Sequence, residues 1–168
     1  PSPTRREFLR TSSAAAAFAL AAPGIIIRES AFAANTDTLK VGLVGCGGRG
    51  TGAAGNALTA DSNCILTAVG DVFAGQAEGA VKGLKEQFGN RIAVTPETQF
   101  IGLDAYQKVI DSGVDVILLA SPPGFRPTHL RYAVEKGKQI FCEKPVATDP
   151  VGIRHVMESV KMAKEKKL

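Results

Sequence analysis

The chain has 168 residues and a formal net charge of +4; 45% of its residues are hydrophobic and 21% are charged. This composition provides a core for one globular domain and excludes the collagen-like, coiled-coil and disordered classes. The positive charge lies at the two ends of the chain, Trp is absent and only 6% of the residues are aromatic. We therefore expect no nucleic-acid partner.

The start of the chain has the composition of an export signal. Paired arginines precede an uncharged, Ala-rich stretch over residues 11–27, and the small-x-small sequence of residues 31–33 follows. Secretory signals have this order of segments, and the uncharged stretch is short for a membrane span. The sequence TRREFL of residues 4–9 resembles a twin-arginine (Tat) signal. The resemblance implies that the Tat machinery exports the protein to the periplasm or beyond, with residues 1–33 as the signal peptide.

From Leu39 onward, apolar runs alternate with stretches of helical periodicity. The expected strands cover residues 39–44, 65–69, 91–95, 114–120 and 139–142, of which 91–95 is the weakest. A helix is expected over residues 49–60, and three later helices are marked by apolar faces: Ala77, Val81, Leu84 and Phe88; Leu103, Tyr106, Val109 and Ile110; Leu130, Ala133 and Val134. A last helix opens at Asp149 and Pro150, a suitable cap and first-turn residue. Its expected buried face is Ile153, Val156 or Met157, Val160 and Ala163.

Strands that are almost continuously apolar and alternate with helices indicate a parallel sheet covered on both faces. The pattern predicts an α/β fold over residues 34–168, with a doubly wound parallel sheet of five strands. The three cysteines, Cys46, Cys64 and Cys142, lack the spacing of metal ligands and lie in or beside apolar runs. We expect them to be small buried side chains, with no metal site and no disulfide framework.

A glycine-rich loop follows the first strand. Residues 45–50 fit the pattern G-x-G-x-x-G, and Asp71 follows the second strand 21 residues after the last glycine. A strand before the loop, a helix after it and an acidic residue at this distance are typical of a Rossmann dinucleotide site. The cofactor-binding residues expected in the loop are Gly45, Cys46, Gly47, Gly48, Arg49 and Gly50.

Each glycine of this pattern has a steric or electrostatic role. Gly45 permits the tight turn, Gly47 lets the backbone approach the pyrophosphate, and Gly50 lets the helix pack closely on the strand. The Asp71 carboxylate can accept hydrogen bonds from the adenosine ribose and would repel a 2′-phosphate, so NAD is favoured over NADP. Arg49 either neutralises the pyrophosphate or is a solvated helix residue.

Two further segments follow the fourth and fifth strands. Ser121 and Pro122 begin the first, with His129 near the start of the next helix, and Glu143 and Lys144 form the second. Ligands of open α/β sheets bind beyond the carboxyl ends of the strands. A lysine held there beside a glutamate could hydrogen-bond a substrate hydroxyl or assist proton transfer. The alternatives are a surface lysine before a turn proline and a structural histidine.

Together these motifs resemble the Gfo/Idh/MocA oxidoreductase family, whose members include glucose-fructose oxidoreductase and inositol dehydrogenase. The likeness covers residues 39–168. It implies that Lys144 contacts the substrate near the nicotinamide, in a pocket that Glu143 helps to shape. It also implies that these residues lie along the cofactor: Ser121, Pro122, His129, Glu143 and Lys144.

Members of this family continue into a C-terminal α/β domain that supplies most substrate contacts. Nothing in the chain corresponds to that domain, so we expect a piece of a longer protein that ends before the sixth strand, and any homo-oligomer to form through the missing domain. The leading hypothesis is an NAD(P)-dependent oxidoreductase acting on a sugar or cyclitol hydroxyl. The alternatives are an NAD-dependent glycosidase of the same family, with tightly bound and recycled NAD, and a non-catalytic dinucleotide-binding module.

Overall fold

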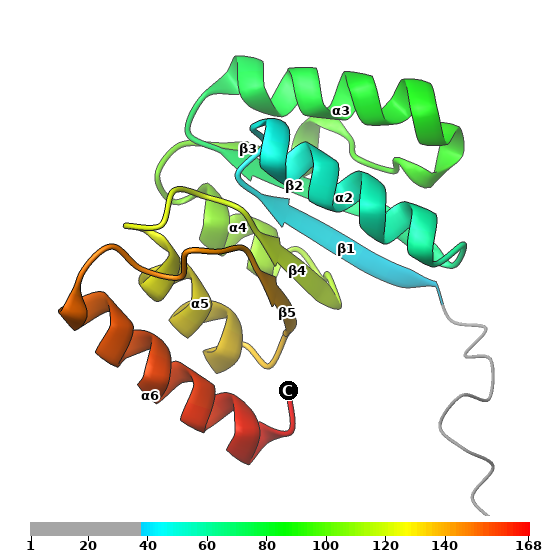
Figure 1. Cartoon of the computed structure of the whole chain (residues 1–168). Coiled ribbons are helices and arrows are strands. Elements are labelled where there is room, and N and C mark those ends of the chain that lie inside the picture. The colour runs from blue at the N-terminus through cyan, green and yellow to red at the C-terminus, as the bar shows by residue number, and fades with distance from the viewer. Residues whose placement is uncertain (1–37) are drawn as a thin grey trace, which may run out of the picture. The chain divides into compact units, whose positions relative to one another are not determined.

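The computed structural model describes residues 38–168, so the expected signal peptide lies outside the described residues. The described part forms a five-stranded sheet with helices on both faces (Figure 1). Its strands are β1 (Leu39–Val44), β2 (Cys64–Asp71), β3 (Gln99–Ile101), β4 (Val116–Leu119) and β5 (Gln139–Cys142). Its α-helices are α2 (Gly48–Ala60), α3 (Ala74–Phe88), α4 (Ala105–Asp111), α5 (Arg126–Glu135) and α6 (Pro150–Lys166).

All neighbouring strands are parallel, in the order β3-β2-β1-β4-β5. The chain winds outward from β1 to β3, returns to the other side of β1, and continues to β5. This confirms the doubly wound sheet expected from the sequence. The winding reverses between β1 and β4, and in such sheets the loops that follow these two strands part and leave a ligand crevice.

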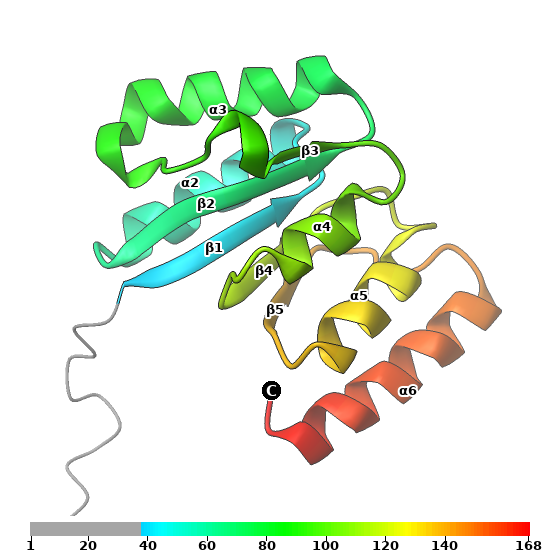
Figure 2. The same ribbon diagram turned by 180° about the vertical axis from the view of Figure 1, so that it is seen from behind.

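Two apolar cores sandwich the sheet. One contains Leu43, Leu66 and Leu84 beneath α2 and α3, and the other contains Ile117 and Val134 beneath α4 and α5. Figure 2 shows α4 and α5 on the face turned away from α2, with α6 beside α5. A strand covered on both faces must be apolar on both, which is why the strands read as continuous apolar runs.

The third strand lies later in the chain than expected. Residues 91–95 form no strand beyond an isolated bridge between Leu66 and Ile92, and β3 is Gln99–Ile101. β3 pairs with the last three residues of β2. Pro96 opens a 3₁₀ turn between the two segments, and because proline has no N–H it cannot continue a ladder. The turn delivers the chain to the carboxyl end of β2.

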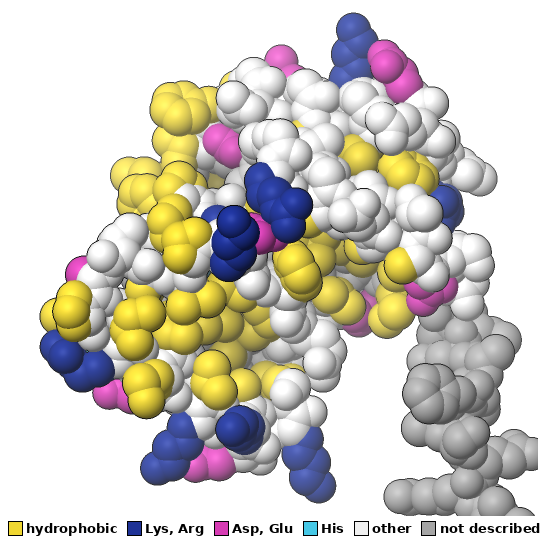
Figure 3. Space-filling model, in the orientation of Figure 1, with side chains coloured by type: hydrophobic (Ala, Val, Ile, Leu, Met, Phe, Trp, Pro, Cys, Tyr) yellow, Lys and Arg dark blue, Asp and Glu magenta, His cyan; other side chains and the backbone are white. Residues whose placement is uncertain are grey.

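Two expected helix faces also differ from the structure. In α6 the buried positions are Gly152, Val156 and Ser159. Of the expected face, Val156 is buried and Ala163 packs against the core, whereas Ile153, Met157 and Val160 are exposed. Compared with the expected orientation, the helix is rotated about its axis, so that Gly152 faces Pro127. The approach is so close that a Cβ on Gly152 would lie 3.2 Å from Pro127 Cγ. Figure 3 shows hydrophobic side chains gathered on the face that carries β5 and α6.

Leu103 precedes α4 and is 70% exposed, so it is not part of that helix's buried face. The other expected members of the face lie on α4, where Val109 and Ile110 are fully buried. The fourth strand is shorter than expected: β4 covers Val116–Leu119, and Val114, although buried, lies before it.

The cysteines are all free, with Cys46 and Cys64 buried and Cys142 partly buried, as the sequence predicts. Burial raises the pKa of the Cys46 thiol to about 12, so this side chain is an inert core group. Among residues 38–168 no helix combines the length and apolarity needed to cross a membrane. In the same range no cluster of His, Cys, Asp and Glu side chains has the arrangement of a metal site.

Candidate functional site

The glycine loop joins β1 to α2 and packs directly on the end of β4. Gly45 has a φ of +92°, and a Cβ on it would lie 2.5 Å from the backbone nitrogen of Ser121. A Cβ on Gly50 would lie 1.8 Å from the carbonyl oxygen of Gly45. Only glycine fits at either position, since any side chain would push the helix off the strand. These are the tight turn and the close approach that the sequence analysis assigned to the two residues.

Asp71 closes the loop from the neighbouring strand. One carboxylate oxygen accepts the backbone N–H of Cys46 at 2.7 Å, and the other accepts the N–H of Phe73 at 2.9 Å. A carboxylate has about four acceptor positions, so two remain for ligand hydroxyl groups. Asp71 therefore orients the loop and keeps acceptor capacity toward a ribose.

The start of α2 has the features of an anion site. Gly47 is the N-cap residue, no side chain caps the helix, and the first turn contains no acidic residue. A Cβ on Gly47 or Gly48 would meet no atom within 4 Å, so the space above both residues is open. Unpaired N–H groups and the positive end of the helix dipole favour a phosphate there.

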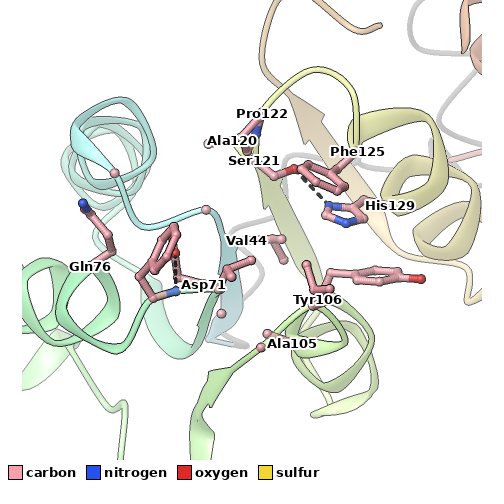
Figure 4. Close-up of a pocket in the computed structure, with 17 residues that line it drawn as sticks. Val44, Asp71, Gln76, Ala105, Tyr106, Ala120, Ser121, Pro122, Phe125 and His129 are labelled. Atoms are coloured by element: carbon pink, nitrogen blue, oxygen red, sulfur yellow. Dashed lines mark hydrogen bonds between the residues drawn. The ribbon is translucent and has the colours of Figure 1, made fainter.

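A cavity of about 500 Å³ lies beyond the carboxyl ends of β1, β2 and β4. Six of the residues predicted from the sequence line it: Gly45, Gly47, Asp71, Ser121, Pro122 and His129. Figure 4 shows Asp71 on one side and Ser121 and His129 on the other, with Val44 between them. The remaining predicted residues do not line it: Cys46, Gly48, Arg49, Gly50, Glu143 and Lys144.

His129 is a buried wall of this cavity. Its Nδ1 shares a hydrogen bond of 2.9 Å with Ser121 Oγ, and its ring stacks on Tyr106 with centroids 4.1 Å apart. Burial lowers the His129 pKa to about 4, so the imidazole is neutral near pH 7. A neutral imidazole with one nitrogen held by a hydroxyl offers a single hydrogen-bonding nitrogen and no charge to a ligand.

The segment after β5 is connected to the glycine loop. The Glu143 carboxylate is buried and accepts from Arg49 at 2.8 Å. This hydrogen bond from Arg49 is the main reason that the pKa of Glu143 lies below its usual range. Arg49 thus has a partner that neither of the two interpretations from the sequence included. Lys144 is exposed, its backbone N–H donates to Glu143 Oε1, and the bond between Lys144 and Pro145 is cis.

The cavity has an apolar rim that the sequence motifs did not predict. Phe73, Leu103 and Phe125 line it and are 70%, 70% and 51% exposed. Large exposed apolar side chains suit a flat ring that needs cover from water. Phe73 could have been noticed from its position two residues after Asp71. Leu103 could not, because its spacing matches the helix that follows.

The family comparison agrees with this geometry. The model of an oxidoreductase family, described as an NAD-binding Rossmann fold, matches residues 39–168, which is most of the chain. The chain belongs to the Gfo/Idh/MocA oxidoreductase family. Its Gfo/Idh/MocA domain binds NAD, and the resemblance stated from the motifs is confirmed over the same residues.

Curated relatives of this Gfo/Idh/MocA domain include inositol 2-dehydrogenases. One from Cereibacter sphaeroides is 34% identical over 122 residues, covering 73% of this chain and 33% of that protein. Inositol 2-dehydrogenase 2 from Saccharopolyspora erythraea is 30% identical over 125 residues, covering 73% of this chain and 32% of that protein. The chain spans about a third of the length of these relatives.

Solved structures share the fold. A scyllo-inositol dehydrogenase from Lactobacillus casei, solved with NAD(H) and scyllo-inositol, has a TM-score of 0.60 and 23% identity, covering 78% of this chain and 34% of that one. A probable dehydrogenase from Thermotoga maritima has a TM-score of 0.57 and 25% identity, covering 77% and 34%.

The residues present fit NAD. The open space above Gly47 suits the pyrophosphate and the free acceptor positions of Asp71 suit the adenosine ribose. Phe73 and Leu103 offer apolar cover for the adenine ring. None of the described residues that line the cavity is Lys or Arg, so the site has no obvious partner for an additional phosphate.

Proposed function

We propose that this chain is the cofactor-binding part of an NAD-dependent oxidoreductase that moves a hydride between a cyclitol or sugar hydroxyl and the nicotinamide ring. The observation that carries the proposal is the connection between the dinucleotide loop and the segment that bears Lys144. Arg49 of the loop and Glu143 of the segment form an ion pair at 2.8 Å although they are 94 residues apart. The cofactor loop and a potential proton-transfer group are thereby held at one edge of the sheet.

NAD, when bound, supplies the hydride acceptor or donor. In this proposal Asp71 and the glycine loop orient the nucleotide, and His129 with Ser121 forms a neutral wall on the far side of the cavity. Lys144 hydrogen-bonds the substrate hydroxyl and assists the transfer of its proton. A carboxylate at the ribose position and a cavity without basic residues favour NAD over NADP.

The relatives suggest which substrate to test first. Several proteins that match this chain are inositol 2-dehydrogenases, so a cyclitol is the first candidate and a sugar the second. Any homo-oligomer is proposed to form through a region equivalent to the two thirds of the relatives that this chain does not match.

We also propose that the protein is exported. The support is the twin-arginine pattern of residues 4–9 together with the uncharged stretch and the small-x-small site that follow it. The Tat pathway carries folded proteins, so NAD can be bound before export, while the protein is still in the compartment where NAD is plentiful.

The test uses the full-length protein with NAD and a panel of inositols and sugars, and it follows the appearance of NADH. Lys144→Ala is expected to lower kcat by roughly 100-fold or more, the range for loss of a proton-transfer group, with NAD affinity unchanged. Lys161→Ala, an exposed lysine on α6, is the matched control and should keep full activity. An unchanged kcat in Lys144→Ala would contradict the assigned role. Turnover of a glycoside without net NADH would favour the recycling glycosidase.

A further inference from the structure

Arg126, the first residue of α5, is a buried charge that stability alone does not explain. Arg126 is only 5% exposed, and its Nε has no hydrogen-bond partner among the described residues. Burying a guanidinium with an unpaired N–H is costly. A positive charge at a helix N-terminus is also disfavoured by the helix dipole.

Among residues 38–168, the hydrogen bonds of Arg126 all go to the segment that carries Lys144. Nη1 donates to the carbonyl oxygen of Glu143 at 2.7 Å and to the carbonyl oxygen of Pro145. An Nη group has two hydrogens, so each carbonyl receives one. The Glu143 carboxylate is paired with Arg49. Arg126 adds a minor electrostatic contribution to the lowered Glu143 pKa, but its hydrogen bonds go to the backbone carbonyls.

These two carbonyls stand one residue before and one residue after Lys144. The backbone N–H of Glu143 is bonded to Leu119 in β4, and Asp149 caps α6 further on. Between these anchors Pro145 has no N–H to donate, and the Lys144 N–H reaches only the Glu143 side chain, at 3.2 Å. Arg126 therefore supplies hydrogen bonds that hold this turn to α5, beside the apolar packing of Val146.

We propose that Arg126 is a positioning residue for Lys144. It holds the carbonyls on both sides of Lys144 in place, so that the exposed lysine extends from a rigid turn. This inference rests on the proposed function, because it assumes that Lys144 acts on the substrate. A misplacement of about 1 Å at a reacting group costs on the order of 100-fold in rate, which gives a reason to keep a costly buried charge.

A double-mutant cycle in the full-length, NAD-bound enzyme tests the inference. Arg126→Ala is expected to lower kcat for inositol oxidation roughly 10- to 100-fold, while the KM for NAD changes less than about threefold. In a Lys144→Ala background the same change should cost less than about twofold in kcat, because the group that it positions is gone. Arg126→Lys, which retains the charge and donor hydrogens, should restore part of kcat. Arg131→Ala, which alters a partly exposed arginine on the same helix whose ion pairs are with Glu135 and Glu158, is the matched control.

The outcomes separate this inference from the proposed function. Equal losses of kcat in the wild-type and Lys144→Ala backgrounds would overturn the inference and make Arg126 a purely structural residue. A parallel loss of NAD affinity would do the same. An unchanged kcat in Lys144→Ala alone would overturn the proposed role of the lysine without any change at Arg126. If Arg126→Ala does not fold, the cycle is run with Arg126→Lys, and the same additive result would overturn the inference.

Discussion

At Gly47 the fold leaves space for a side chain, so the glycine is explained by the cofactor and not by packing. Its φ of −66° is open to any residue, and a Cβ there would meet no atom within 4 Å. Gly45 and Gly50 differ, because a Cβ on either would collide with backbone atoms. The absence of a side chain at Gly47 therefore serves whatever occupies the space above it, and the pyrophosphate is the group expected there.

Gly47→Ala should lower the free energy of unfolding by no more than about 1 kcal/mol, because alanine is a poorer N-cap than glycine, and should weaken NAD binding by about tenfold or more, equivalent to about 1.4 kcal/mol. Calorimetric titration of the full chain with NAD, beside a thermal melt, measures both quantities. Gly52→Ala is the control, since its site inside α2 is equally open. Alanine there should stabilise the helix by up to about 1 kcal/mol without affecting NAD. If Gly47→Ala bound NAD with the wild-type affinity, the placement of the pyrophosphate above Gly47 would be wrong.

At the scale of an element, α5 contributes two buried polar side chains from its first turns. Arg126 holds the segment after β5, and His129 faces the cavity between Ser121 and Tyr106. Both side chains belong to one short helix, so the position of α5 on the sheet sets the cavity wall and the Lys144 turn together. Pro127 lies at the first helical turn, where its missing N–H costs no helical hydrogen bond.

The buried histidine makes stability depend on pH. The pKa of His129 is about 4 in the folded chain against an ordinary 6.5, so between these values the unfolded chain binds a proton that the folded chain does not. Stability is therefore lost as pH falls from about 6.5 to about 4, by roughly 3 kcal/mol in total. Denaturant unfolding across this range measures the loss. His129→Asn should flatten the dependence, whereas His155→Gln, on the exposed side of α6, should retain it. Equal slopes in wild type and His129→Asn would contradict this assignment.

At the scale of the whole molecule, the site lies at the carboxyl ends of the strands. The strands are added first on one side of β1 and then on the other. Asp71 ends β2, Ser121 follows β4 and Glu143 follows β5. Three segments that are tens of residues apart in the chain thus meet beyond the carboxyl edge. The site requires the complete sheet, so a protein exported after folding could carry the site already assembled.

The export proposal predicts a defect when the arginine pair is altered. Replacing Arg5 and Arg6 together by Lys should leave the precursor inside the cell, folded and able to bind NAD, because the Tat machinery requires the arginine pair and not only positive charge. Cell fractionation with detection of the protein measures this. Arg10→Lys, in the same segment but outside the pair, is the control and should be exported. Normal periplasmic accumulation of the double variant would count against Tat export.

Much of the fold followed from local patterns. The apolar runs identified β1, β2, β4 and β5, and the glycine loop with Asp71 identified the dinucleotide site. The placement of β3 was wrong, and the expected buried face of α6 was right only at Val156 and Ala163, for a shared reason. Both depend on contacts with distant residues, such as the pairing with the end of β2 and the approach of Gly152 to Pro127. Helical periodicity identifies candidate stripes, but the neighbouring elements decide which stripe is covered.

The fold class, the family and the dinucleotide loop can be predicted from the amino-acid sequence, because they depend on short motifs and on the alternation of strands and helices. The contacts of the polar residues around the site depend on how the chain folds. Arg49 pairs with Glu143 across 94 positions, and Arg126 holds the Lys144 turn across 17 and 19. Such contacts form only when the carboxyl ends of separate strands are brought together, so the spacing of residues within one segment cannot predict them.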